Sequence, residues 1–345
     1  FVLGAAYFVV MLIAAFSYRI PAPGWKPRGW TGPKADAPSR RLVSSHDVSI
    51  DQAVKTPQFY LLWVVLCFNV TAGIGVLGVA QTMMKEIFGT TLPDTVDANF
   101  AANYVLMISV FNMLGRFFWA SASDYLGRKT TNTLFFVLGI ALYLSIPYTA
   151  YRVSVSPAVT WLVVFYAATM LIFTMYGGGF ATIPAYLADL FGARYVGGIH
   201  GRLLTAWSVA GALGPWAITW FRERSIRAAI DDLVAKIDPA RFAEAFGAPV
   251  DQLELLVAGK TVTISRLMEL APPGTIDPSS TVYNSTMYVM AGLLAIALAA
   301  NLLIRPVDAK HHLKLEEASR AANSSKGEPP RKMASRSSGD YTAPS

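Results

Sequence analysis

Apolar segments of about the length of a membrane-spanning helix alternate with polar segments along this chain. A helix needs about 20 mostly apolar residues to cross the hydrocarbon core of a bilayer, and seven segments approach that length. We therefore predict an all-α membrane protein. The expected divisions are a transmembrane helix at 1–18, a linker at 19–56, five transmembrane helices within 57–220, an insertion at 221–283, a last transmembrane helix at 284–304 and a tail at 305–345.

The composition agrees with this prediction. Of the 345 residues, 54% are hydrophobic and only 15% are charged, whereas soluble domains average about 25% charged residues. The net charge of +7 comes from Lys and Arg in the polar segments that flank the spans. Such residues favour the cytoplasmic side, so we interpret the charge as a sign of membrane topology and expect no nucleic-acid partner.

The same charge pattern orients the chain. We expect the linker and a disordered tail in the cytoplasm, on the inner side of a membrane that the chain crosses several times. By alternation, the insertion at 221–283 then lies outside as a folded segment. Its own basic residues do not contradict this, because long segments are translocated largely regardless of charge. The chain starts at Phe1 within an apolar run, and we expect helices that precede it.

Glycines are concentrated within the apolar segments. Gly73, Gly75 and Gly78 form a G-x-G-x-x-G pattern, but a dinucleotide site needs a preceding strand, which the sequence does not predict. We expect them to allow close helix packing. The triplet 177–179 and Pro184 predict a bend or break in the long segment 157–189. A close-packing face is also expected within 200–220, formed by Ala206, Ser208, Ala210, Gly211, Ala212 and Gly214.

One cation, Arg116, lies well inside an apolar segment. A charge at the centre of a spanning helix costs about 2.5–3.5 kcal/mol on insertion scales, so such residues are usually functional. No acidic residue occurs at the centre of any predicted span. Arg116 is therefore expected to bind an anionic substrate. The alternative is that it pairs with a backbone carbonyl or with an acid on helices outside this chain.

The polar turn that follows contains Ser121, Asp124, Gly127, Arg128 and Lys129. It resembles the signature loop of the major facilitator superfamily, whose transporters consist of two six-helix halves. The resemblance implies that the chain covers about helices six to twelve and that helices one to five complete the fold. Asp124 can pair with Arg128, and Gly127 can adopt the positive φ of a tight turn. The alternative is an ordinary solvated loop.

A narrower resemblance is to the oxalate/formate antiporter family of bacteria, which implies a multi-pass protein of the bacterial inner membrane. It rests on three motifs: Asn112-x-x-Gly-Arg116-x-x-Trp followed by Ser-Asp124, Tyr176-Gly-Gly-Gly-Phe180-Ala-Thr-Ile-Pro-Ala-Tyr, and Gly201-Arg-Leu-Leu-Thr-Ala-Trp207. The resemblance implies a carboxylate site in which Arg116 is a cation and Tyr176 and Phe180 form an aromatic wall. Trp207 stands where oxalate exchangers have a second cation, a Lys. One cation suits a monocarboxylate better than oxalate.

We therefore expect a secondary transporter of small carboxylates that works by alternating access, with anion exchange as the mechanism. The alternatives are a proton-coupled monocarboxylate symporter and a transporter-like membrane sensor. The spans contain no H-E-x-x-H, G-x-S-x-G or paired aspartates, so we expect no enzyme and no catalytic residues. Cys67 is the single cysteine and lies in an apolar run. No metal site and no cofactor are expected.

Overall fold

The computed structural model describes residues 2–19, 25, 42–44 and 46–313. The expected disordered tail lies almost wholly outside these residues, as does much of the linker. The regular elements in the described ranges are helices, joined by one isolated bridge between Val48 and His312, which confirms the all-α class. The chain forms two units, Phe1–Arg40 and Arg41–Ser345. The first contains the apolar helix α1 (Val2–Ser17).

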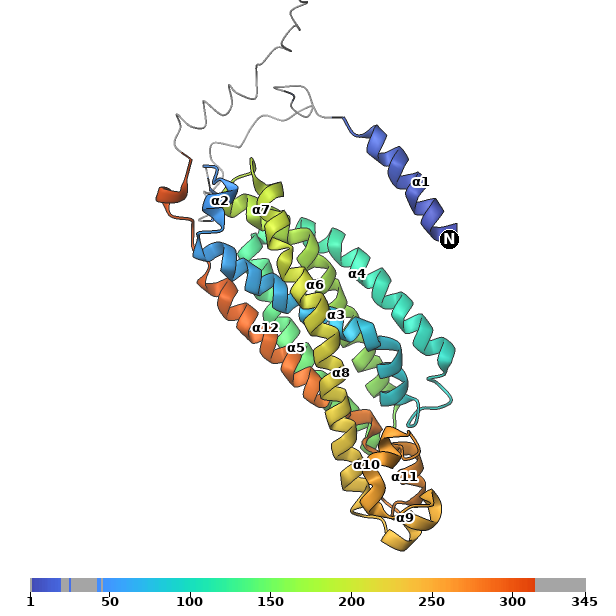
Figure 1. Ribbon diagram of the computed structural model, residues 1–345. Helices are drawn as coiled ribbons and strands as arrows, with labels where there is room; N and C mark the ends of the chain where they lie inside the picture. Colours follow the sequence, from blue (N-terminus) through green and yellow to red (C-terminus); the bar gives the residue numbers. More distant parts are fainter. Residues whose placement is uncertain (1, 20–24, 26–41, 45, 314–345) are drawn as a thin grey trace, which may run out of the picture. The chain divides into compact units, whose positions relative to one another are not determined.

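The second unit is a bundle of long helices (Figure 1). Helix α4 packs on α6, α3 on α8 and α12, and α5 on α6 and α12. Their bounds are Pro57–Phe88 for α3, Ala98–Leu126 for α4, Arg128–Val155 for α5, Val159–Phe191 for α6, Thr205–Val234 for α8 and Asn284–Leu303 for α12. We call the end of the bundle that holds residues 124–129 the turn end. The opposite end, which carries the segment after α8, is the insertion end.

Five helices are long and apolar enough to cross a membrane, namely α3, α4, α5, α6 and the segment 278–303 that contains α12. Helix α1, with 16 residues, is shorter. Helix α8 lies alongside α3 in the bundle but is not among the five. Five of the seven predicted spans thus coincide with helices of sufficient length and hydropathy. The spanning role of α1 and α8 stays a prediction.

Helix α8 differs from the predicted element at both ends. The sequence places a span between His200 and Trp220. The structure has a separate short helix, α7 (Val196–Leu203), followed by α8 from Thr205 to Val234. Hydropathy falls after Trp220, yet Arg, Glu, Ala and Leu are good helix formers, so the helix continues into the predicted insertion. The boundary of the apolar segment is therefore not the boundary of the helix.

The rest of the insertion is a small helical lobe, as the sequence predicts for a folded segment. Asp238 caps the start of α9 and Gly247, at φ +70°, ends it. Phe242 and Phe246 are buried, with ring centroids 4.7 Å apart. Helix α11 packs against α8. The elements of this lobe are α9 (Pro239–Phe246), η1 (Val250–Gln252), α10 (Leu253–Ala258), α11 (Ile264–Leu270) and η2 (Pro278–Thr281).

Of the bend or break predicted in α6, the structure contradicts the break, and a bend stays a prediction. The helix runs without interruption through Gly177–Gly179 and Pro184. A Cβ at Gly177 would overlap the backbone of Asn112, and one at Gly178 would overlap the ring of Trp119, both on α4. The triplet serves close approach of two helices and does not end one of them.

Glycines also allow α3 to approach its neighbouring helices closely. A Cβ at Gly75 would lie 3.1 Å from the carbonyl oxygen of Gly214 on α8, and one at Gly73 would overlap the ring of Tyr176. Gly78 has open space around it. Of the small residues expected to pack in α8, only those four apart are buried, namely Ala206, Ala210 and Gly214. This spacing keeps them on one helix face.

The end of the predicted linker is folded against the turn end. The amide of Ser44 donates to the carbonyl of Asp189 (2.7 Å), and that of Val48 to Phe191 (2.8 Å). The amide of Leu313, beyond α12, donates to the carbonyl of Asp47 (2.9 Å). Two short elements complete this region, α2 (Ile50–Ala53) and η3 (Ala309–His311). Ser44, Asp47 and Val48 thus join the C-terminal end of α6 to the segment after α12.

Candidate functional site

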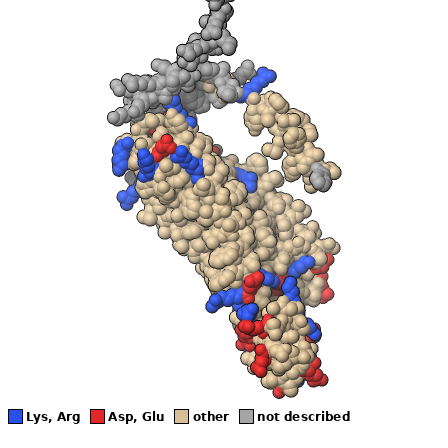
Figure 2. Space-filling model, in the orientation of Figure 1, with Lys and Arg blue, Asp and Glu red and all other residues tan. Residues whose placement is uncertain are grey.

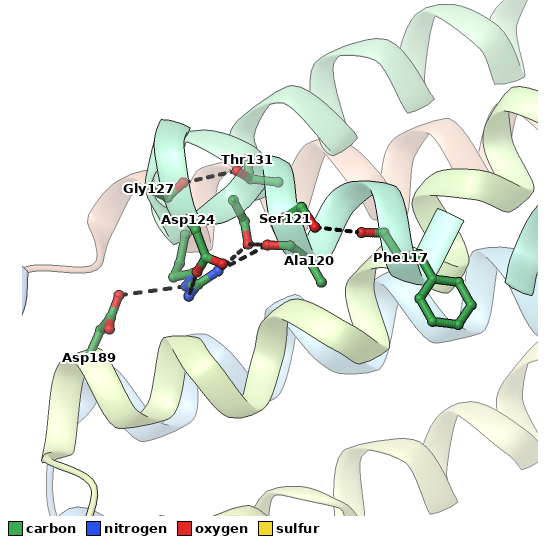
Figure 3. A network of polar contacts seen from close by, with 9 residues as sticks. Phe117, Ala120, Ser121, Asp124, Gly127, Thr131 and Asp189 are labelled. Carbon is green, nitrogen blue, oxygen red and sulfur yellow. Dashed lines mark hydrogen bonds and ion pairs between the residues drawn. The ribbon is translucent and has the colours of Figure 1, made fainter. Parts of the chain in front are cut away.

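The polar turn between α4 and α5 has the local geometry that its sequence predicts. Gly127 adopts φ +86°, which favours glycine. Arg128 forms an ion pair with Asp124 and also donates to the hydroxyl of Ser123. The Nε of Arg128 also lies 3.8 Å from the carboxylate of Asp189 on α6, and Figure 3 shows Asp189 beside the turn that contains Asp124 and Gly127. The turn is therefore tied to a third helix.

Lys129 links the same turn to α12. Its Nζ donates to the carbonyls of Leu302 (2.8 Å) and Ile304 (2.7 Å). Carbonyls at a helix C-terminus have no partner within the helix, so a cation there is favourable. Asn301 donates in return to the carbonyl of Lys129 (3.0 Å), and Tyr186 of α6 contacts the Asn301 amide oxygen (3.3 Å). Four helices meet at this turn.

The structure brings together the four residues predicted to bind substrate. Arg116 of α4 places its Cζ 5.3 Å from the ring centroid of Phe180 on α6. Phe180 contacts Tyr176 edge-on at 5.0 Å and Trp207 of α8 at 4.4 Å. We call Arg116, Tyr176, Phe180 and Trp207 the aromatic box. Three helices contribute to it; Phe180 is partly buried and Trp207 is exposed.

Arg116 has no ion pair with a carboxylate among the described residues. Its side chain is exposed in this unit, and its described contact is with the face of Phe180. A cation over an aromatic face gains about 0.5–2 kcal/mol, and this contact leaves the guanidinium N–H groups free to donate. The box thus presents a fixed cation beside apolar rings, an arrangement suited to a small organic anion.

Two amides beside the box were not predicted as site residues. Asn112 lies one turn before Arg116 on α4 and contacts Gly177. Asn69 of α3 lies beside Gly179 and lines a small cavity of about 20 Å³ together with Tyr143 and Tyr176. A space of that size holds about one water molecule. A polar residue within an apolar helix was the available signal for both amides.

Residues 1–215 match the Major Facilitator Superfamily, which is more than half of the chain. The chain therefore belongs to this superfamily of multi-pass membrane transporters. This confirms the family predicted from the turn and the expectation that the chain is not an enzyme, because the superfamily consists of transporters.

The chain is also similar to two individual transporters. The chain is 28% identical over 209 residues to the oxalate:formate antiporter of Oxalobacter formigenes, an alignment that covers 60% of this chain and 43% of that protein. It is 23% identical over 180 residues to the uncharacterized MFS-type transporter YhjX of Escherichia coli (strain K12), covering 51% and 40% respectively. The chain thus spans about two fifths of the length of these relatives.

Proposed function

We propose that this chain supplies half of the substrate site of a secondary transporter for small carboxylates, with Arg116 as the residue that binds the carboxylate. The observation that carries the proposal is the aromatic box. Its cation lacks a carboxylate partner among the described residues, and the nearest ring, Phe180, is joined to Tyr176 and Trp207. The similarity to an oxalate:formate antiporter supports the same class of substrate.

The guanidinium geometry suits this role. Its planar N–H groups can donate two parallel hydrogen bonds to one carboxylate. In a region of low dielectric, such a pair is worth more than at a surface. The box has a single cation, because Trp207 is the α8 residue that faces Phe180. A monocarboxylate such as formate or lactate leaves no charge unpaired there, whereas oxalate leaves one.

We infer that the turn end faces the cytoplasm and the insertion end the outside of the bacterial inner membrane. Lys and Arg gather at the turn end, and a broad uncharged band separates them from the charged insertion end (Figure 2). Excess Lys and Arg in short loops favour the cytoplasmic side. The ion pairs of Arg128 would then hold together the cytoplasmic ends of α4, α5 and α6 during part of the alternating-access cycle.

Counterflow of labelled formate, lactate and oxalate in proteoliposomes tests the role of Arg116. In the complete transporter, Arg116→Gln should lower uptake at least about 100-fold, because the carboxylate loses a charged double hydrogen bond. Arg116→Lys should restore little, since an ammonium group cannot form the same fork.

The matched control is Arg152→Gln. Arg152 also lies over aromatic rings, 4.8 Å from the centroid of Trp161, but near the end of α5. Uptake should stay within about twofold of the unmodified protein, as for most exposed surface changes. Normal uptake by a folded Arg116→Gln variant would overturn the proposed function.

A further inference from the structure

A second pocket with a positive lining lies at the insertion end, remote from the aromatic box. It has a volume of about 590 Å³ and is formed by the end of α3, the extension of α8 and the lobe around α11. Ligand pockets commonly measure about 300–1,000 Å³. Its charged lining residues are Lys85, Glu86, Arg222 and Lys260. We call this space the insertion pocket.

One side of the insertion pocket is fixed by a polar cluster. Arg222 of α8 forms an ion pair with Glu86 of α3, and its Nε lies 3.0 Å from Glu86 Oε2. The hydroxyl of Tyr283 donates to the same carboxylate oxygen (2.6 Å). Glu86 is therefore neutralised and has two donors already. Glu86, the single acidic residue of the lining, is therefore not available to hold a cation, and its partner Arg222 is not available to hold an anion.

Two cations of the lining remain. Lys85 and Lys260 form no ion pair with a carboxylate among the described residues, and both are exposed to the pocket's solvent. Hydroxyls from Thr90, Thr263, Ser265 and Ser279 also line the space, together with apolar side chains such as Ile226, Ile230 and Val262. Cations and hydroxyl donors beside an apolar wall favour a small organic anion and disfavour a cation.

The backbone of Lys260 provides a separate observation. Its φ is +54°, and it is the one non-glycine residue with positive φ among those described. Lysine gains no local hydrogen bond that would favour this conformation, unlike Asn or Asp. The conformation belongs to the turn that ends α10, where the amide of Thr261 donates to the carbonyl of Leu256 (2.9 Å). Glycine is usual at such a position, and another residue costs about 1–2 kcal/mol there. The preceding residue, Gly259, has φ −76°, so the strain falls on the residue that carries the charge.

We propose that the insertion pocket binds a small carboxylate through Lys85 and Lys260, as a collecting site at the outer mouth of the transporter. A neighbouring pocket of about 600 Å³ shares Lys260 and adds Glu223, Arg224 and Arg227. Arg227 lies 3.7 Å from Glu254. The two linings together have more basic than acidic residues, and Figure 2 shows Lys and Arg at this junction with some Asp and Glu among them. A local positive field raises the concentration of anions near the entrance. The choice of a carboxylate rests on the proposed function, whereas the positive charge of the pocket does not.

Equilibrium binding to the complete transporter in nanodiscs tests this proposal on an Arg116→Gln background, which removes the cation of the aromatic box. Labelled formate, lactate and oxalate are the probes. At least one should bind saturably. Lys85→Gln combined with Lys260→Gln should weaken that binding about tenfold, which is the loss expected for two charge contacts of moderate strength.

Two further variants separate charge from structure. Lys236→Gln is the control, because Lys236 pairs with Asp232 on the same α8 extension and does not line the insertion pocket. It should leave binding unchanged. Lys260→Gly removes the charge and relieves the backbone strain, so it should weaken binding while thermal stability stays equal or rises.

In an Arg116-containing protein, the double lysine variant should raise KM about tenfold at low ionic strength and leave the maximal rate nearly unchanged. If none of the three probes binds saturably on the Arg116→Gln background, the proposal that the insertion pocket binds a carboxylate is overturned, and the proposed function is not affected. Equal binding by the double lysine variant and the Lys236→Gln control would do the same. Failure of the Arg116 uptake experiment, with lysine-dependent binding retained, would instead overturn the proposed function.

Discussion

Two of the arginines in the helices of this bundle have contrasting partners: Arg116 lies within α4, and Arg222 lies where α8 reaches the insertion end. Arg222 is held by Glu86 and Tyr283, and the three side chains join α8, α3 and the segment before α12. Arg116 has an aromatic ring as its described partner and no carboxylate. The same side chain therefore stabilises the fold in one region and remains available for an anion in the other. The difference is the presence of a carboxylate on a neighbouring helix.

Removal of Arg222 should have the largest effect on stability. Arg222→Gln leaves Glu86 partly buried without its cation, and such a change costs about 2–3 kcal/mol for a pair that retains some exposure. Thermal unfolding in detergent, followed by circular dichroism, should show a clearly lowered midpoint. Arg116→Gln should leave the midpoint unchanged or raise it, because it removes an unpaired charge from an apolar helix. Equal destabilisation by both variants would remove the contrast between the two regions.

The packing that positions Arg116 can be changed without touching its charge. Gly177→Ala inserts a Cβ against the backbone of Asn112, which lies on α4 one turn from Arg116. Separation of α4 from α6 should lower stability by about 2 kcal/mol and reduce uptake.

Gly78→Ala on α3 is the matched control for this change. Its Cβ would meet open space, so stability should rise by up to about 1 kcal/mol through helix propensity. Thermal midpoints and counterflow rates measure both variants. Similar behaviour of the two alanines would show that the close contact between α4 and α6 does not position the box.

Addition of a second cation beside Arg116 tests whether the single charge of the aromatic box sets the preference for a monocarboxylate. Trp207→Lys places an ammonium group next to Phe180, where two cations repel unless a dianion lies between them. The ratio of oxalate to formate uptake in counterflow should rise about tenfold, equivalent to about 1.4 kcal/mol. Trp216→Lys is the control, because Trp216 is on α8 but contacts Trp220 and not the box. An unchanged ratio in a folded Trp207→Lys protein would end the argument for a monocarboxylate while leaving Arg116 as the anion ligand.

Much of the architecture could be read from hydropathy. The spans that became α3, α4, α5, α6 and α12 were predicted because apolar side chains must cover a helix in lipid. The end of α8 was missed, because charged residues after Trp220 change hydropathy without opposing a helix. A bend or break was expected at Gly177–Gly179, and the helix does not break there. The sequence pattern is the same whether a glycine permits a bend in its own helix or close contact with another helix. Only the position of the neighbouring helix distinguishes the two roles.

The sequence by itself determined the all-α class and the pair Asp124–Arg128, since these follow from the length of the apolar segments and from local spacing. It predicts Arg116 as an anion-binding residue from the cost of a charge in lipid. The tertiary structure decided which residues meet. The contacts of Arg128 with Asp189, of Lys129 with α12 and of Arg222 with Glu86 join residues far apart in the chain. The insertion pocket exists because the lobe brings Lys260 to the same space as Lys85. Local propensity carries no information about such encounters, because they depend on how whole helices pack.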